Sequence, residues 1–233
     1  MTRVCAIMQP TWLPYLGYFH LIAASDVFVL LDDVQFARRS WQSRNRILGP
    51  AGEQMLTVPV RSHDRDTQIR AIEVDDSQPW RSKHLTALRH AFARRPFLGE
   101  GMAFMEQQLE RPGTSLSGLT GGLIIEASRK LGLTAEIRLA SELECPGARS
   151  EHLLAICRAV GADAYLSTAG SADYMAEDGV FDAAGMPVRF QSFVEVPYDQ
   201  GREPFTPFMG FIDAVMNLGW DGTRRLLDTM AGR

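Results

Sequence analysis

The feature that most restricts the fold lies between residues 4 and 31. Val4–Met8 is a continuous apolar run typical of a buried strand, and from Leu16 to near Ser25 apolar residues recur at helical spacing. A second apolar run follows at 27–31. Strand, helix and strand this close together form a βαβ unit, whose two strands are parallel and joined by a right-handed crossover. The pattern therefore predicts an α/β protein built on a parallel sheet.

Strands and helices continue to alternate along the rest of the chain. Further strands are expected at 55–60, 69–74, 134–139, 164–167 and 188–193, and helices within 80–131 and at 150–160, 211–217 and 223–230. This order predicts one α/β domain over residues 1–233, with a mostly parallel, Rossmann-like (nucleotidyltransferase-like) sheet. Because a helical stretch interrupts the alternation, we expect a helical insertion at about residues 78–132.

Composition narrows the class of partner. The 233 residues are 45% hydrophobic and carry a formal net charge of −4, which allows a sizeable core but leaves no basic footprint for nucleic acid. No apolar run approaches the ~20 residues of a membrane span, and the first residues lack a long apolar signal segment. We therefore expect a cytoplasmic protein that binds neither nucleic acid nor membrane.

Cysteines and histidines give no sign of a metal site. Cys5, Cys145 and Cys157 are odd in number and widely spaced, so they suggest reduced thiols rather than a disulfide framework or a metal-ligand pattern. The five histidines show no zinc-like clustering. We expect no metal and no cofactor.

The loop after the first strand is the first candidate site, with Gln9, Tyr15, Gly17 and Tyr18 as ligand-binding residues. In an open parallel sheet, ligands bind at the carboxyl ends of the strands, and the following helix N-terminus attracts anions. Residues 14–18 are similar to the Pro-x-His-x-Gly-His element of nucleotidyltransferase-type folds, with tyrosine at both histidine positions. Tyrosine carries no positive charge, so the similarity favours the fold more than nucleotidyl transfer. The alternative is an aromatic loop that caps the sheet.

Polar residues also follow the second strand. Asp32 and Asp33 are candidates to bind an amine or to act as a general base, with Gln35 beside them. The alternative is that these carboxylates cap the next turn. The Arg-rich stretch that follows supplies Arg39, Trp41, Arg44, Asn45 and Arg46. Arginine pairs bidentately with phosphate or carboxylate, although such a stretch can also be a solvated face.

Three further segments give weaker signals. Ser167 and Tyr174 lie in a turn of small residues after a strand, without the Gly-x-Ser-x-Gly elbow of a serine hydrolase. Tyr198 and Gln200 follow the last predicted strand and suit substrate hydrogen bonding, or form a simple turn. His84 lies on one helical face with Trp80, either as a substitute base in a cleft or as a structural histidine.

Motifs along nearly the whole chain resemble the WbqC-like protein family. They are residues 6–10 (AIMQP), 14–19 (PYLGYF), 32–36 (DDVQF), 39–46 (RSWQSRNR), 80–84 (WRSKH), 165–167 (YLS), Tyr174, 197–200 (PYDQ) and 205–219 (FTPFMGFIDAVMNLG). The chain departs from the family pattern at 11–13 and 169–171. The resemblance implies a place among genes for surface polysaccharides or specialised metabolites, pathways that join amino sugars or amino acids to activated acyl groups.

The leading hypothesis is therefore a transferase that passes an acyl or aminoacyl group to the amine of a nucleotide sugar or amino acid. The donor is a thioester of an acyl carrier protein or of CoA. Arg44, Arg46 and the amides near Gly17 would hold phosphate, while Tyr15 and Tyr18 would bind the developing oxyanion. The alternatives are a nucleotidyltransferase or ATP-using ligase, and a non-enzymatic nucleotide-sugar binding protein.

These segments should meet in one place. Loops that follow neighbouring parallel strands emerge at the same sheet edge, so residues far apart in sequence converge there. We expect a single polar cleft lined by Gln9, Tyr15, Tyr18, Asp32, Asp33, Gln35, Arg39, Asn45 and Arg46.

Overall fold

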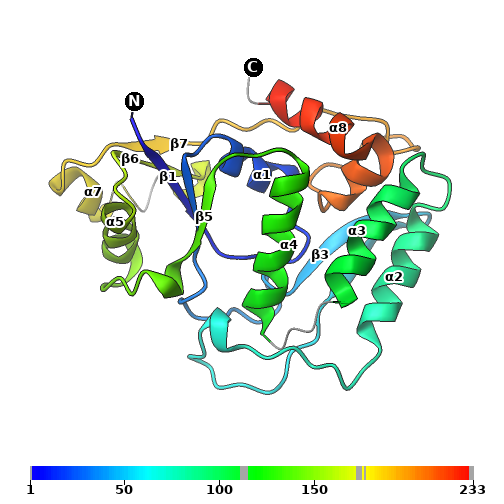
Figure 1. Ribbon diagram of the computed structural model, residues 1–233, viewed down its shortest axis with the longest axis horizontal. Coiled ribbons are helices and arrows are strands. Elements are labelled where there is room, and N and C mark those ends of the chain that lie inside the picture. Colours follow the sequence, from blue (N-terminus) through cyan, green and yellow to red (C-terminus); the bar gives the residue numbers. More distant parts are fainter. Residues whose placement is uncertain (1, 111–114, 172–174, 176, 231–233) are drawn as a thin grey trace.

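A computed structural model describes residues 2–110, 115–171, 175 and 177–230 and contains a central sheet of five parallel strands (Figure 1). The strands are β1 (Val4–Met8), β2 (Val27–Leu30), β5 (Glu136–Leu139), β6 (Ala164–Ser167) and β7 (Val188–Phe190), in the spatial order β5-β2-β1-β6-β7. From β1 the chain adds β2 and then β5 on one side, and then adds β6 and β7 on the other side of β1. This is a doubly wound, Rossmann-like sheet, which confirms the predicted fold class.

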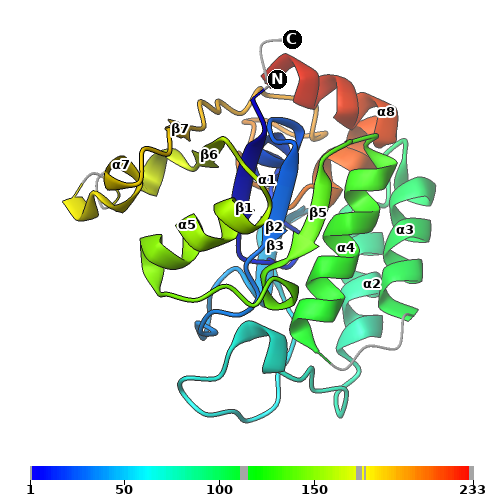
Figure 2. The ribbon, with the colours of Figure 1, turned by 60° about the vertical axis from the view of Figure 1, so that its left-hand side comes forward.

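The three central strands β2, β1 and β6 are buried on both faces, which explains why they are apolar runs, whereas the edge strands β5 and β7 are partly exposed and carry charged residues. Ala6, Phe28 and Leu30 face one core, whereas Cys5 and Val29 belong to the other. The first core is covered by α1 (Leu16–Ala23), α4 (Leu116–Lys130) and α8 (Ile212–Met230), and the second by α5 (Arg149–Ala159) and α7 (Val180–Ala183). Figure 2 shows α4 and α5 on opposite sides of the strands.

The connection from β2 to β5 contains the main departures from the predicted elements. Strands β3 (Arg44–Gly49) and β4 (Gly52–Thr57) pair with each other as a separate antiparallel hairpin, and β3 was not expected in the Arg-rich stretch. The strand predicted at 69–74 is wrong. A short 3-10 helix, η1 (Ile69–Ala71), begins there, followed by the extended Ile72 and by isolated bridges at Glu73 and Val74; Ile69 and Ile72 are both fully buried.

Helices α2 (Trp80–Ala91), α3 (Leu98–Glu110) and α4 follow the hairpin, close to the predicted helical stretch. Two further 3-10 turns are η2 (Ala140–Glu142) and η3 (Ala169–Ser171). Gly219 interrupts α8 with a φ of 71°, so the two C-terminal helices predicted from the sequence are joined across a kink. Within the described ranges, none of the helices combines the length and apolar character that crossing a bilayer requires.

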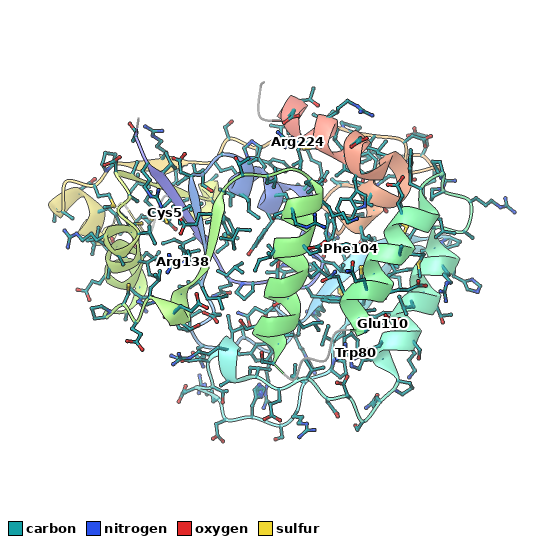
Figure 3. All side chains as sticks on the ribbon, in the orientation of Figure 1. Cys5, Trp80, Phe104, Glu110, Arg138 and Arg224 are labelled. Carbon is teal, nitrogen blue, oxygen red and sulfur yellow. The ribbon has the colours of Figure 1, made fainter. Side chains whose placement is uncertain are left out.

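Aromatic packing joins α3 to α8. Phe104, labelled in Figure 3, contacts Phe211 and Trp220 edge-on, with ring centroids 5.9 Å and 5.0 Å away. Gly101 allows the close approach of the two helices, because a Cβ atom there would collide with the Met216 side chain. This contact attaches the helices after the hairpin to the core of the sheet domain.

We predict that Phe104→Ala lowers the free energy of unfolding by about 3–5 kcal/mol, because the truncation leaves a cavity among buried rings. Urea denaturation measures the change. Ile125→Ala is the matched control, since Ile125 is 45% exposed on α4 and its truncation should change stability by no more than about 0.5 kcal/mol. Equal effects of the two substitutions would contradict the assigned core.

Candidate functional site

Two adjoining chambers open at the carboxyl ends of β1 and β6, where the strand order reverses. Their volumes are about 360 Å³ and about 320 Å³, and both are lined by Met8, Thr11 and Trp41. We call them together the switch-point cleft. The first chamber also has Gln9, Gln42, Ser167, Thr168 and Ser171, and the second has Pro14, Tyr15, Tyr18, Asn45, Arg46 and Phe208. A reversal of strand order is where doubly wound sheets bind their ligands.

The first chamber offers uncharged hydrogen-bonding groups. The Gln9 side-chain oxygen accepts a hydrogen bond from Gln42 Nε2 at 2.8 Å, and its Nε2 has no partner among the described residues. Ser167 Oγ lies 2.6 Å from Ser171 Oγ. An amide donor with no protein partner at the edge of a chamber is available to a ligand.

Tyr15 is the most available donor of the second chamber. Its ring packs edge-on against Phe193 and Phe208, and it folds over Gly17, where a Cβ atom would lie 2.7 Å from the Tyr15 hydroxyl. Among the described residues, that hydroxyl has no hydrogen-bond partner. Burial, and then the charge of Glu195, raise the pKa of Tyr15, so the hydroxyl stays protonated and can donate.

Tyr18, by contrast, is already engaged. Its hydroxyl donates to the backbone oxygen of Gln9 at 3.1 Å, and burial raises its pKa well above the usual value. Tyr18 thus lines the second chamber while holding the loop that carries Gln9.

Trp41 stands between the two chambers and is 50% exposed, which makes it a flat surface for a ring. The Arg46 guanidinium lies 5.6 Å from its ring and forms an ion pair with Glu53 at 2.8 Å. Asn45 is occupied at both ends of its side chain, with Nδ2 bound to Leu13 O and Oδ1 to the Arg46 amide. Because Glu53 neutralises part of its charge, Arg46 contributes only a partly compensated positive charge to the second chamber.

Glu195 is a candidate functional residue that the sequence reasoning missed. Its carboxylate accepts a hydrogen bond from the Phe208 amide at 2.6 Å. Burial, together with nearby Asp213, raises the pKa of Glu195, while Arg46 opposes the rise. A single acid among Phe193, Val194 and Val196 was the available signal. The carboxylate is not among the residues that line the two chambers, but it is bound to Phe208 of the second chamber and its charge acts on Tyr15.

Asp32 and Asp33 have protein partners at the end of β2. Asp32 is 2% exposed and accepts hydrogen bonds from Ser117 Oγ, Ser141 N and Ser141 Oγ at 2.9–3.1 Å. Asp33 pairs with His152 at 3.2 Å. Gln35 also points elsewhere, with its Nε2 donating to Arg65 O at 2.8 Å. None of the three lines the switch-point cleft.

His84 lies in the core rather than in the cleft. Its ring packs against Trp12 and Trp80 at 5.7 Å and 5.1 Å, and Nε2 lies 3.2 Å from Thr57 O. Burial lowers the pKa of His84 to about 4, so the ring is neutral at physiological pH. This environment fits the structural interpretation of His84, which is not among the residues that line the switch-point cleft.

The remaining sequence candidates divide into three places. Arg39 and Arg44 line a separate cavity of about 290 Å³ beside Arg38 and Arg61. Ser167 lies in the first chamber, and Tyr174 falls outside the described residues. The single cleft expected from sequence thus becomes the switch-point cleft, the Arg39 cavity and a group of internally bonded side chains.

Tyr198 and Gln200 belong to a buried network around Asp213, a carboxylate with no exposed surface. Asp213 Oδ1 accepts hydrogen bonds from Tyr198 Oη at 2.7 Å, Gln200 Nε2 at 3.2 Å and Asn217 Nδ2 at 3.3 Å. Burial raises the pKa of Asp213 to about 6, because loss of hydration outweighs these three donors. The network fixes the 198–200 segment to the start of α8.

Among the residues that the structure describes, no three His, Cys, Asp or Glu side chains are grouped so that they could hold a metal ion. The site is thus described by its aromatic rings, amides, hydroxyls and the carboxylate of Glu195.

Comparison with known proteins adds a family and one relative. The model of the WbqC-like protein family matches residues 9–225. A protein of Mycobacterium tuberculosis (strain ATCC 25618 / H37Rv), named Uncharacterized protein Rv1507c, is 29% identical over 216 residues. That match covers 92% of this chain and 93% of the relative. No solved structure matches the chain.

We predict that Asp32→Ala lowers the free energy of unfolding by about 2–4 kcal/mol, because it leaves buried donors of Ser117 and Ser141 without an acceptor. Urea denaturation measures this loss. Ser141→Ala, which removes only part of the same network, should cost less. An unchanged midpoint for Asp32→Ala would contradict the structural role.

We predict that Asp213 makes stability fall with rising pH. Its folded-state pKa of about 6 exceeds the ordinary 3.8, so its contribution is fully present below pH 4 and is lost as pH rises through 6. The full change is about 3 kcal/mol. Asp213→Asn should reduce this dependence in urea titrations between pH 4 and 7, whereas Asp199→Asn, an exposed neighbour, should retain it. Parallel curves for Asp213→Asn and the wild type would contradict the assignment.

Proposed function

The chain belongs to the WbqC-like protein family, and from this premise we propose that it is a biosynthetic acyl- or aminoacyltransferase. The donor is a thioester of CoA or of an acyl carrier protein. The acceptor is the amine of a nucleotide sugar or amino acid, in a cytoplasmic step of surface-polysaccharide or specialised-metabolite synthesis.

The observation that carries the proposal is the proximity of Tyr15, which lines the second chamber, to Glu195, whose carboxylate is bound to Phe208 of the same chamber wall. An uncharged hydroxyl donor faces the chamber without a protein partner, and a carboxylate of raised pKa lies close to it. Acyl transfer needs such a pair, since an oxyanion forms while an amine loses a proton. The Gln9 amide is a second donor across the shared wall.

The reaction follows from these groups. The acceptor nitrogen attacks the thioester carbonyl carbon and a C–N bond forms. The resulting oxyanion accepts a hydrogen bond from Tyr15, while the Glu195 carboxylate takes the proton that the amine loses. Collapse of the intermediate breaks the C–S bond, and the proton passes from Glu195 to the departing thiolate. The products are an amide and a free thiol.

Binding is assigned to the rest of the cleft. Trp41 supplies an exposed ring face on which a base or sugar can stack. Arg46 contributes to anion affinity, although its ion pair with Glu53 limits that contribution. Asp32 and Asp33 act here as supports of the cleft edge, because Ser117, Ser141 and His152 already occupy their carboxylates.

A second candidate is a protein that binds a nucleotide sugar without turnover. The first chamber favours it, since Gln9, Thr11, Ser167, Thr168 and Ser171 are all uncharged and supply no general base. Nucleotidyl transfer has less support, because tyrosines stand where that chemistry uses histidines.

We predict that Glu195→Gln lowers kcat about 10²–10⁴-fold with little change in KM, because it removes the proton acceptor. Tyr15→Phe should lower kcat about 10²–10³-fold by removing one oxyanion donor. The assay measures thiol release from a panel of acyl- and aminoacyl-CoA thioesters with UDP-amino sugars or amino acids as acceptors. Glu100→Gln, on an exposed position of α3, is the control and should leave the rate unchanged.

Two outcomes separate the candidates. Amine-dependent thiol release that Glu195→Gln abolishes supports acyl transfer. Tight binding of a UDP-amino sugar with no thiol release from any donor supports the binding protein. Thiol release that neither substitution affects would contradict the assigned site.

A further inference from the structure

A separate cavity of about 650 Å³ lies where the end of α2, the β3–β4 turn and the 200–203 segment meet. It shares no lining residue with the switch-point cleft. The function proposed above uses none of its charged groups. Its size leaves room for a phosphorylated small molecule.

The charge of this cavity is unbalanced. Arg94, Arg95 and Arg202 line it, and Glu203 is the acid among the lining residues. Within the described ranges, neither Arg94 nor Arg95 forms a hydrogen bond or an ion pair through its side chain. Arg46, Arg81 and Arg224 have acidic partners, whereas Arg94 and Arg95, in the part of the chain that the structure describes, line one cavity without such a partner.

Arg95 is placed by the backbone rather than by a carboxylate. Its guanidinium lies directly against Gly201, where a Cβ atom would collide with it. Gly201 has a φ of 71° and donates its amide to Asp199 Oδ1 at 2.6 Å, so the turn that receives the guanidinium is fixed. The Arg95 side chain is partly buried there and keeps its donors free.

Hydrogen bonds of Gln200 and Arg202 fix the 200–203 segment, which forms another wall of the cavity. Arg202 donates through Nη1 to Gly49 O at 3.1 Å, which anchors the side chain while its Nη2 remains available. Gln200, also on the wall, is bound to Asp213 and to both backbone groups of Thr206. Arg202 is therefore carried on a segment whose side-chain contacts already fix it before any ligand arrives.

We propose that this arginine cavity binds the phosphate or diphosphate group of a small metabolite. Guanidinium forks pair bidentately with phosphate oxygens, and several of them suit a group of two or more negative charges. The three arginines and the one glutamate give the cavity wall a formal charge of +2. A phosphate dianion would neutralise this charge, whereas a ligand with one carboxylate would neutralise only half of it. The proposal is independent of acyl transfer at the switch-point cleft.

Isothermal titration calorimetry with inorganic pyrophosphate tests the proposal on the full chain. We expect saturable binding to the wild type that weakens as NaCl is raised, because the interaction is electrostatic. The double substitution Arg95→Gln/Arg202→Gln should raise Kd at least about tenfold, since each lost charged hydrogen bond weakens binding. Arg158→Gln makes one equivalent charge change on the exposed side of α5 and should leave Kd unaltered.

A second variant keeps the test decisive if the double variant does not fold. Arg94→Gln alters an exposed, unbonded side chain of the cavity and should raise Kd about threefold or more. Absence of pyrophosphate binding to the wild type, or equal Kd values for wild type and folded cavity variants, would overturn the proposal. Citrate that binds as tightly as pyrophosphate would overturn the assignment to phosphate. Thiol-release activity does not enter either result, so failure of the acyltransferase proposal leaves this test intact.

Discussion

The carboxylate of Asp32 joins three parts of the chain that are distant in sequence. Asp32 lies two residues after β2, and its carboxylate accepts one hydrogen bond from Ser117 on α4 and two from Ser141 on η2, after β5. A buried carboxylate is tolerated only when donors replace its lost water, so these contacts fix one another. The crossover helix and the return of the chain toward α5 are thereby set relative to the sheet edge where the cleft opens.

Buried parallel strands were the most predictable part of the fold. Because both faces of such a strand are buried, Val4–Met8 and Ala164–Ser167 are apolar runs, and the sequence predicts their positions and their ends correctly. The β3–β4 hairpin was harder, because it pairs only with itself and keeps polar residues such as Arg46 and Glu53 on its strands. The apolar residues at 69–74 are compatible with a strand as well as with a helical turn, because the segment is too short for its periodicity to distinguish them.

At the site, the sequence located the sheet edge but not the partners of each side chain. Gln9 and Tyr15 line the switch-point cleft because they follow β1, and strand order alone places them there. The bonds of Asp32 to Ser141 and of Glu195 to Phe208 depend on tertiary contacts that no local pattern encodes. The same holds for His84, whose packing between Trp12 and Trp80 is invisible in its helical spacing.

One segment connects the two candidate binding regions. Glu195 is bound to Phe208 of the second chamber of the switch-point cleft, and five residues later Gln200 forms part of the arginine cavity. Between them, Tyr198 is fixed to Asp213, which Gln200 and Asn217 also bind. Two ligands influence each other only when an intervening element has two arrangements with different affinities. Because Tyr198 and Gln200 bind the buried Asp213 of α8, we expect the segment to act as a rigid support, so that a ligand of one region leaves the affinity of the other region unchanged.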